Sequence, residues 1–254
     1  MHSLTIVTIN RNNSTGLQET LTSIVNQTYS AINLVIVDGA SSDDSLKVID
    51  KITNNNSKMQ VCVISEKDNG IYNAMNKGIN NSDGDYIFFL NSGDQFFDEN
   101  AVENVFSQVD NEDVVYGNIC LSVRGKIKVL NSNPEIRFFD RYQHDMPPHP
   151  AIFIKTTKIL DIGGFNERYK IVSDVALIMT LFSDKNLKYK FIDMPITVFD
   201  SNGVSSKSEN KDLIYKERRH FILNHYPNYL DDFESIYEKK NSLLSRLLRW
   251  TSKA

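Results

Sequence analysis

Residues 84–94 read Gly-Asp-Tyr-Ile-Phe-Phe-Leu-Asn-Ser-Gly-Asp, an apolar run that ends in a short polar tip. A short apolar run bounded by turn residues is typical of a buried strand. We therefore expect a strand at Tyr86–Leu90 with Asn91–Asp94 directly after it. Three earlier runs have the same character and predict further strands: residues 4–9, 34–37 and 61–64.

Segments with helical spacing follow these strands, and two of them begin at the helix-start residues Ser14 and Ser42. The apolar positions concerned are Leu17, Leu21, Ile24 and Val25; Leu46, Ile49 and Ile52; Ile71, Met75 and Ile79; and Val102, Val105, Phe106 and Val109. Strands that alternate with helices through short connections imply right-handed crossovers. The predicted fold class is therefore α/β, with a mostly parallel central sheet flanked by helices.

The predicted strand ends suggest where a ligand binds, because ligands of such sheets lie outside the carboxyl ends of the strands. Three of these ends carry polar residues: Thr8–Arg11, Asp38–Asp43 and Asn91–Asp94. The oxygens of Asp, Asn, Ser and Thr suit a sugar nucleotide and a hard divalent cation. The sequence therefore predicts a ligand site at this edge of the sheet.

The second half of the chain is less regular. From residue 111 we expect, in order, a hairpin-like strand pair (114–121 and 126–130), a stiff loop (146–150), a short apolar strand (151–154), a Gly-Gly turn (163–165), a helix opened by Asp174, two strands (189–192 and 196–199) and helical structure from about 210 onward. We find no repeat and no long linker. We therefore expect one continuous domain over 1–205 and a helical C-terminal extension over 206–254.

Composition and charge exclude several classes of protein. The chain has 254 residues and a net charge of −4, which argues against a nucleic-acid-binding surface. Its two cysteines, Cys62 and Cys120, are too few for a disulfide scaffold, and their apolar surroundings predict reduced core thiols. No apolar stretch reaches the roughly 20 residues of a membrane span, and the N-terminus lacks the features of a secretory signal. We expect a cytoplasmic protein.

Several motifs of well-known enzyme classes are absent from the sequence. It has no G-x-G-x-x-G after the first strand, no P-loop, no H-E-x-x-H and no G-x-S-x-G. Its five histidines show no compact spacing that would bind zinc. The polar strand ends are what remains to carry chemistry.

Two carboxylates are candidates for that chemistry, and each also has an ordinary structural explanation. Asp94 lies where a cation and a diphosphate would meet beyond the strand, but Asn-Ser-Gly-Asp is also typical of a β-turn. Asp174 could be a general base that takes a proton from an acceptor hydroxyl, or a helix-start residue favoured by capping. The residues alone leave both alternatives open.

Other polar residues have the same two interpretations. Asp38 could accept a hydrogen bond from a ribose hydroxyl or a base N–H, or belong to an ordinary turn. Asn73, Asn76 and Lys77 could face the pocket, although Lys77 could equally be a solvated surface charge. His149, between two prolines, could lie towards the acceptor or be a structural loop residue.

Taken together, these segments resemble the family 2 glycosyltransferases, which have the GT-A fold, invert the anomeric centre and use nucleotide sugars. The matching residues are V-T-I-N-R-N (7–12), S-I-V-N-Q-T-Y (23–29), L-V-I-V-D-G-A-S-S-D (34–43), S-E-K-D-N-G-I-Y-N-A-M-N-K-G-I (65–79), G-D-Y-I-F-F-L-N-S-G-D (84–94), G-G-F-N-E (163–167) and S-D-V-A-L (173–177). The resemblance implies a nucleotide-sugar-binding half over 1–110 and an acceptor-binding half over 111–205. It does not extend to the last 50 residues.

The resemblance also implies roles for individual residues. The donor would be bound by Thr8, Asn10 and Arg11 along the nucleotide, by Asp38 at the uracil or ribose, by Asp68, Asn73 and Asn76, and by Asn91, Ser92, Gly93 and Asp94 in place of the family's Asp-x-Asp element. Asp94 would be the ligand of Mn²⁺ or Mg²⁺, Asp174 the catalytic base, and His149 and Ser173 neighbours of the acceptor. Three positions depart from the family pattern, which favours acidic residues where this chain has Asn73, Asn91 and Ser173.

The implied activity is transfer of a hexose or N-acetylhexosamine from a nucleotide sugar, with UDP as the expected nucleotide. The acceptor would be a hydroxyl of a glycan or lipid-linked glycan in the synthesis of a surface polysaccharide such as O-antigen or capsule. Two alternatives stay open: a non-catalytic subunit that binds sugar nucleotides, and a nucleotidyltransferase. The residues after the first strand, Asn10–Asn13, match the glycine-rich loop of nucleotidyltransferases poorly.

The C-terminal segment 237–254 has leucines on one helical stripe with basic flanks. The apolar members are Leu243, Leu244, Leu247, Leu248 and Trp250, and the basic ones are Lys239, Lys240, Arg246, Arg249 and Lys253. Such a helix could lie in the interface of a bilayer, at the inner face of the plasma membrane. It could equally pack on the catalytic domain or on a second subunit in a homodimer.

Overall fold

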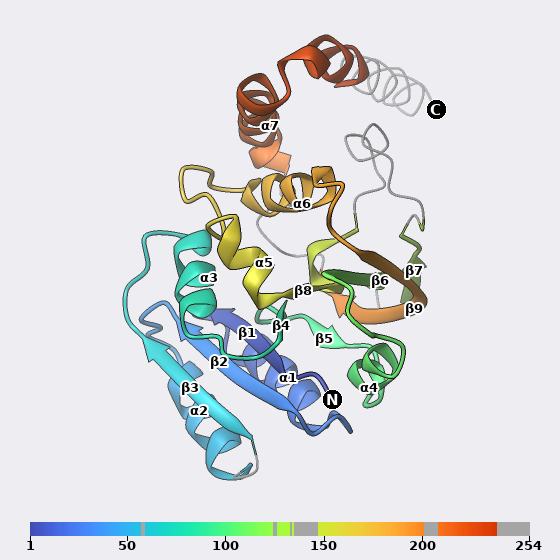
Figure 1. Cartoon of the computed structure of the whole chain (residues 1–254). Coiled ribbons are helices and arrows are strands. Elements are labelled where there is room, and N and C mark those ends of the chain that lie inside the picture. Colours follow the sequence, from blue (N-terminus) through green and yellow to red (C-terminus); the bar gives the residue numbers. More distant parts are fainter. Residues whose placement is uncertain (57–58, 124–125, 133, 135–146, 201–207, 238–254) are drawn as a thin grey trace, which may run out of the picture.

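The computed structural model describes residues 1–56, 59–123, 126–132, 134, 147–200 and 208–237. Its elements are, in order, β1 (Leu4–Asn10), α1 (Ser14–Val25), β2 (Ile32–Asp38), α2 (Ser45–Asn54), β3 (Gln60–Ser65), α3 (Ile71–Asn80), β4 (Tyr86–Phe89), β5 (Gln95–Phe96), α4 (Ala101–Phe106), β6 (Val114–Val123), β7 (Lys126–Leu130), η2 (His149–Ala151), β8 (Ile152–Lys155), α5 (Thr156–Asp161), α6 (Ser173–Ser183), β9 (Tyr189–Phe199), η4 (Ser208–Asn210), α7 (Lys211–His225) and η5 (Pro227–Tyr229). The strands form one mixed sheet (Figure 1).

The sheet confirms the predicted α/β fold class. Its strand order is β3-β2-β1-β4-β8-β6-β9-β5, with β7 paired to β6. The first four of these strands are parallel, as the alternation of strands and helices predicted. Beyond β4 the pairing becomes mixed, because β8 runs antiparallel to both β4 and β6. The predicted hairpin of β6 and β7 is present, and β6 also pairs in parallel with β9.

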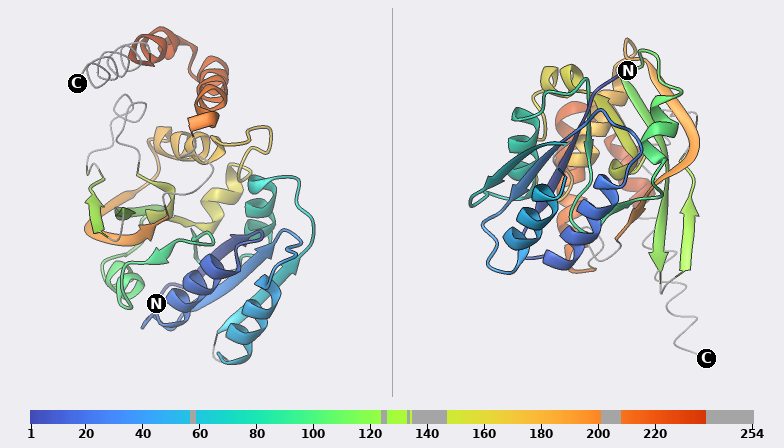
Figure 2. Two further views of the ribbon diagram at one scale, coloured as in Figure 1. Left: turned by 180° about the vertical axis from the view of Figure 1, so that it is seen from behind. Right: turned by 90° about the horizontal axis from the view of Figure 1, so that it is seen from below.

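Helices cover both faces of the sheet, and the alternation of side chains along β1 shows how. Leu4 and Ile6 belong to the core cluster that α1, α2 and α4 complete, whereas Val7 and Ile9 pack in the cluster of α3, α5 and α6. Successive residues of a strand point to opposite faces, so a strand buried on both faces is apolar throughout. Viewed from behind, α1 and α2 lie in front of the parallel strands (Figure 2).

Some predicted boundaries differ from the structure. Helix α2 begins at Ser45 rather than near Ser42, because the hydroxyl of Ser42 donates to Asn12 and the carboxylate of Asp43 accepts from the N–H of Ser45. The two strands expected at 189–192 and 196–199 form the single strand β9, in which Pro195 lies at a shift of register opposite β6. The sequence analysis did not predict β5 or α5, which have two and six residues.

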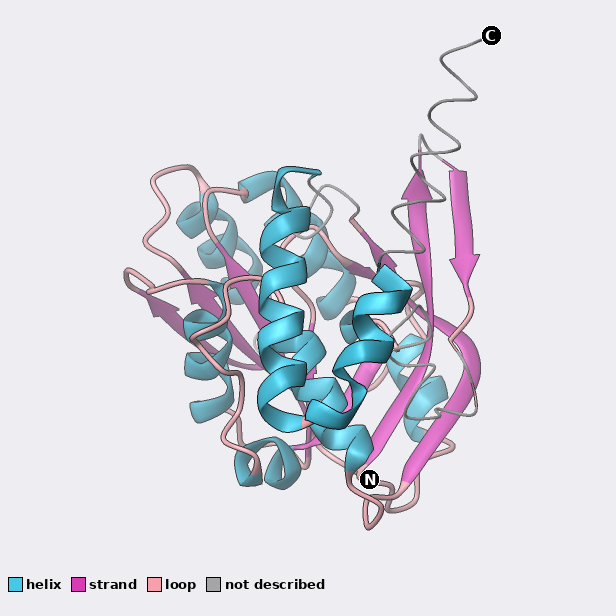
Figure 3. Ribbon diagram, turned by 90° about the horizontal axis from the view of Figure 1, so that it is seen from above, coloured by secondary structure: helices cyan, strands magenta, loops and turns pink. Residues whose placement is uncertain are grey.

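The described part of the C-terminal extension is helical and packs on α6. Phe221 and Ile222 of α7 form a third core cluster with Ala176 and Met179 of α6. Figure 3 looks onto this end of the molecule. Residues 230–237 are also helical, whereas 238–254, nearly all of the predicted amphipathic segment, lie outside the described residues. Within the described residues, no helix combines the length and apolar composition needed to cross a bilayer.

Both cysteines are free thiols, as expected, but only one of them is a core residue. Cys120 on β6 is buried, and Cys62 on the edge strand β3 is half-buried. The position of β3 at the edge of the sheet explains the difference, because an edge strand is covered on fewer sides.

Candidate active site

A cleft of about 660 Å³ lies at the carboxyl ends of β1 and β4, where the polar strand ends predicted a ligand site. Both chain halves contribute to it. Its lining includes Asn10, Arg11 and Asn13 after β1, Asp68 and Gly70 before α3, Asn91, Ser92 and Asp94 after β4, Asp174 on α6, His149 on η2, and Asp200 after β9. The cleft therefore brings together most of the residues to which the sequence analysis assigned a role.

The segment Asn91–Asp94 is a β-turn, and its last residue places a carboxylate in the cleft. The N–H of Asp94 donates to the Asn91 carbonyl oxygen over 2.9 Å. Gly93 has a φ of +108°, which favours glycine, and its N–H donates to the hydroxyl of Thr20. The two interpretations of this motif are therefore compatible, since the turn is what positions Asp94 at the cleft.

Asp94 is a buried carboxylate with little compensation for its charge. It is 4% exposed, and its Oδ1 accepts from the N–H of Asp200 over 2.9 Å. Burial raises the pKa of Asp94 to about 7; the Asp200 N–H opposes this shift, and the charge of the Asp200 carboxylate adds to it. A buried carboxylate of this kind is stabilised by a cation.

The oxygens around Asp94 fit a hard divalent cation. The Oδ1 atom of Asn91 is buried and has no hydrogen-bond partner among the described residues, although the same residue lies at the cleft. Asp200 is close enough that a Cβ atom at Gly93 would come within 3.2 Å of its Oδ2. Within the described residues no group of three or more His, Cys, Asp or Glu side chains could hold a metal ion. A cation here would therefore need the Asn91 amide and ligand oxygens as well as Asp94 and Asp200.

Asp174 lies in the first turn of α6 and lines the same cleft. Its Oδ1 atom accepts from the hydroxyl of Tyr72 over 3.0 Å and from the N–H of Val175 over 2.8 Å. Its Oδ2 atom accepts no hydrogen bond from any described residue. Two described residues therefore hold Oδ1, and none of them donates to Oδ2.

His149 lines the cleft, but Ser173 does not. The Nε2 atom of His149 is buried without a partner among the described residues. Burial lowers the pKa of His149, and the negative charge of Asp174 opposes this shift, so the imidazole is neutral at pH 7. Ser173 is 1% exposed, and its hydroxyl lies in the protein interior.

The predicted nucleotide-binding residues after β1 and β2 are only partly at the cleft. Arg11 is exposed at its mouth, whereas Thr8 is fully buried below it. Asp38 is also fully buried, and its carboxylate accepts hydrogen bonds from the side chains of Asn10, Ser41 and Ser65 and from the N–H of Ser41. These bonds tie the loops after β1, β2 and β3 together.

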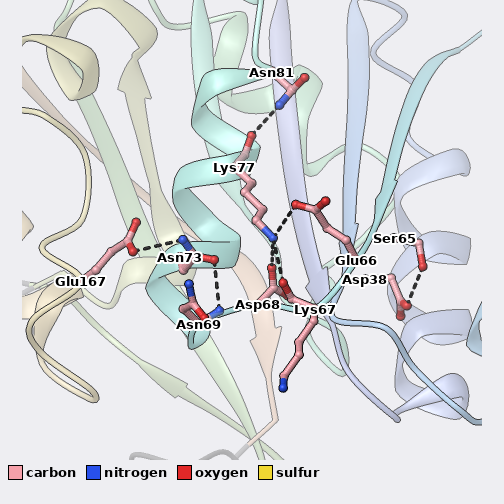
Figure 4. Close-up of polar contacts among 10 residues, drawn as sticks. All are labelled: Asp38, Ser65, Glu66, Lys67, Asp68, Asn69, Asn73, Lys77, Asn81 and Glu167. Carbon is pink, nitrogen blue, oxygen red and sulfur yellow. Dashed lines mark hydrogen bonds and ion pairs between the residues drawn. The ribbon is translucent and has the colours of Figure 1, made fainter.

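Asp68 is held at the cleft by an ion pair from α3. Its Oδ1 atom is 2.6 Å from Nζ of Lys77, which also lies 2.8 Å from Oε1 of Glu66 (Figure 4). These hydrogen bonds, that of Asp68 first, raise the pKa of Lys77. Lys77 is therefore neither a pocket residue nor an isolated surface charge, since it fixes the loop that carries Asp68.

Asn73 and Asn76 do not line the cleft, because their amides bind the loop after α5 instead. Their Nδ2 atoms donate to the two carboxylate oxygens of Glu167 over 3.1 and 2.8 Å; Figure 4 shows the bond from Asn73. Asn76 also exchanges two hydrogen bonds with the backbone of Phe165. Gly164, at a φ of +71°, allows this approach, since a Cβ atom there would lie 2.7 Å from Oδ1 of Asn76.

Asn76→Ala is expected to lower the free energy of unfolding by about 2–4 kcal/mol, because it leaves buried polar groups of the Phe165 backbone without partners. Chemical denaturation would measure this change. Asn81→Ala is the matched control, at the residue that follows α3, since its exposed amide makes one bond, to the Lys77 carbonyl oxygen. Equal stability of the two variants would contradict a clamping role for Asn76.

Sequence reasoning missed three residues at the site: Tyr72, Asp200, and Glu217, whose carboxylate accepts from the backbone N–H groups just before α6. Tyr72 lay within a matching segment but was not assigned a role. Asp200 follows a predicted strand, and the same polar-tip signal that indicated Asp94 would have found it. Glu217 lies on α7, where no local pattern distinguishes it from a surface charge.

Comparison with known proteins identifies relatives of both the sequence and the fold. The family model described as Glycosyl transferase family 2 matches residues 3–167. A "PGL/p-HBAD biosynthesis glycosyltransferase" of Mycobacterium bovis is 25% identical over 224 residues, which cover 84% of this chain and 82% of that protein. Glycosyltransferase GlyG of Streptococcus pneumoniae is 34% identical over 104 residues, 40% of this chain and 34% of GlyG.

The fold is that of solved glycosyltransferase structures. Staphylococcus aureus TarS 1–349 in complex with UDP-GlcNAc superposes with a TM-score of 0.73 at 19% identity, over 92% of this chain and 72% of the TarS chain. The α/β architecture of this chain, with a curled central sheet between helices, matches this fold and confirms the predicted GT-A fold class.

Proposed function

Because this chain belongs to glycosyl transferase family 2, we propose that it moves a hexose or N-acetylhexosamine from a UDP-linked donor to a hydroxyl of a glycan or lipid-linked glycan, with inversion. It is a glycosyltransferase that uses a nucleotide sugar, and the proposal concerns the donor, the acceptor and the stereochemistry. One observation carries it: Asp94 and Asp174, which come from opposite halves of the chain, line one cleft. We place the reaction in the synthesis of a surface polysaccharide.

The proposed reaction is a single displacement in which Asp174 is the general base. Its Oδ2 atom, which no described residue engages, takes the proton of the acceptor hydroxyl. The acceptor oxygen forms a bond to the anomeric carbon as the bond from that carbon to the diphosphate breaks, and UDP leaves with the electron pair. Attack from the face opposite the diphosphate inverts the anomeric centre. Neutral His149 lies at the same cleft, where its Nε2 atom suits a hydrogen bond to the acceptor.

Asp94, Asn91 and Asp200 would hold a divalent cation, Mn²⁺ or Mg²⁺, at the diphosphate end of the cleft. Such a cation, when bound, neutralises the charge that develops on the departing diphosphate. The chain's own contribution is a buried carboxylate that a cation would stabilise, beside a turn whose glycine allows a close approach of the backbone. Arg11 and Asp68 at the other side of the cleft would contact the nucleotide.

UDP is the proposed nucleotide because structures of the same fold hold UDP and UDP-GlcNAc, as S. aureus TarS does. A thermal-shift screen of UDP-, GDP- and dTDP-sugars with and without Mn²⁺ would test the proposal. We expect a UDP-sugar with Mn²⁺ to raise the melting temperature most, because a ligand of the folded state stabilises it as RT ln(1 + [L]/Kd). Release of UDP from that donor, measured in the same samples, separates an enzyme from the alternative of a subunit that only binds.

A truncated chain that ends at residue 237 would test the proposed role of the C-terminal segment. We expect the full chain to sediment with vesicles that contain anionic lipid and the truncated chain to stay in the supernatant. The sequence of 238–254 predicts an amphipathic basic segment, and amphipathic basic helices bind such surfaces. Equal sedimentation of both chains would contradict membrane contact. Sedimentation velocity of the same two chains would show whether the segment instead forms a homodimer.

A further inference from the structure

The hydroxyl of Tyr72 lies between the backbone and the side chain of the base-bearing loop. It is 2.6 Å from the carbonyl oxygen of Ile171 and 3.0 Å from Oδ1 of Asp174. Tyr72 comes from α3 and is 99 and 102 residues away from these partners in sequence. The contact therefore joins the donor-binding half of the chain to the residues that precede and begin α6.

Packing holds the side chain of Tyr72 in place, and its hydroxyl stays protonated and can donate a hydrogen bond. Its side chain is 5% exposed, and its ring stacks on Phe165 at a centroid distance of 5.5 Å. Burial, and then the charge of Asp174, raise the pKa of the phenol, so the hydroxyl keeps its proton. The phenol has one proton, which the carbonyl oxygen of Ile171 and Oδ1 of Asp174 share as acceptors.

Glu217 of α7 also holds this loop. Its carboxylate accepts from three consecutive backbone N–H groups: those of Lys170 over 2.7 Å, Ile171 over 3.0 Å and Val172 over 3.2 Å. These bonds fix the path of the chain up to the start of α6. With the backbone fixed, the N–H of Val175 and the hydroxyl of Tyr72 both engage Oδ1 of Asp174, and Tyr72 is the side chain that does so.

The geometry points to Tyr72 as a positioning residue for the general base: it engages Oδ1 of Asp174, so that Oδ2 faces the cleft and meets the acceptor hydroxyl. This inference rests on the proposed role of Asp174. Preorganised hydrogen bonds to a base reduce the reorganisation needed when the proton moves. Tyr72 acts through Asp174, and its effect on the rate therefore requires that carboxylate.

Tyr72→Phe tests the inference, because it removes the hydroxyl and keeps the ring. We expect kcat to fall about tenfold, while the affinity for the UDP-sugar, measured by thermal shift, stays unchanged. Tyr29→Phe is the matched control. Tyr29 is 7% exposed, stacks on Phe106 at 5.0 Å, and donates to the backbone carbonyl of His2, away from the cleft. The control should lose a similar amount of stability and no activity.

A double-mutant cycle shows whether Tyr72 acts through Asp174. With a radiolabelled donor sensitive enough for slow transfer, adding Tyr72→Phe to Asp174→Asn should change the remaining rate by less than about twofold. If Tyr72→Phe still lowered the rate tenfold in the Asp174→Asn background, the inference would be overturned. An unchanged kcat in the Tyr72→Phe single variant would overturn it as well. If Asp174→Asn itself transferred sugar at the normal rate, the proposed function would fail instead, so the two failures are distinguishable.

Discussion

Asp174→Asn is expected to lower the rate of sugar transfer by about 10²–10⁴-fold, the usual contribution of a general base. The asparagine keeps the shape of the side chain, and its Oδ1 atom can still accept from Tyr72 and Val175. Its amide nitrogen cannot take a proton from the acceptor. Donor binding should be nearly intact, because the residue lies at the acceptor side of the proposed reaction. Initial rates of product formation at saturating donor would measure the loss.

The matched control is Asp184→Asn, at the other end of the same helix. Asp184 is exposed, and its carboxylate accepts from the N–H of Asn186. We expect normal transfer from this variant. Wild-type turnover in Asp174→Asn, or an equal loss in the control, would remove Asp174 from the mechanism. The anomeric configuration of the product, read from the coupling constants of its anomeric proton, would test inversion in the same experiment.

Asp94→Asn is expected to abolish the stabilisation by Mn²⁺ and to lower transfer by about 10²-fold or more, because several kcal/mol of charge stabilisation depend on the cation. Without Mn²⁺, the melting temperature of Asp94→Asn should be no lower than that of the wild type. Burying a charged carboxylate is costly, whereas a neutral amide in its place keeps the bond from the Asp200 N–H at a smaller desolvation cost. Thermal denaturation with and without Mn²⁺ and UDP would measure both effects.

The control for this variant is Asp98→Asn, four residues further along the chain. Asp98 is exposed and caps the N–H of Asn100, outside the cleft lining. It should keep the rise in melting temperature that Mn²⁺ and UDP produce. If Mn²⁺ and UDP raised the melting temperature of Asp94→Asn as much as that of the wild type, the cation would be held by residues other than Asp94. Asp200→Asn should weaken cation binding as well, since the charge of the Asp200 carboxylate acts on Asp94 and both residues line the cleft.

The local pattern of the sequence was sufficient to predict the parallel strands and the edge at which the cleft lies. Buried strands and amphipathic helices have short periods, so a few neighbouring residues identify them. The position of a ligand site on such a sheet then follows from topology. Asp94 and Asp174 could be named as candidates for this reason, since Asp94 ends the turn after β4 and Asp174 is the second residue of α6.

Only the tertiary structure decided what several polar residues do. Asn73 and Asn76 bind Glu167, about 90 residues away, and Asp38 is enclosed by three loops, so these residues act within the protein. Tyr72 acquires its partners across 99 and 102 residues. A periodic pattern records which face of an element is buried, but it contains no information about which distant polar group lies opposite. The partner of each of these polar side chains depends on how the two halves of the chain pack against each other, and only the complete fold determines it.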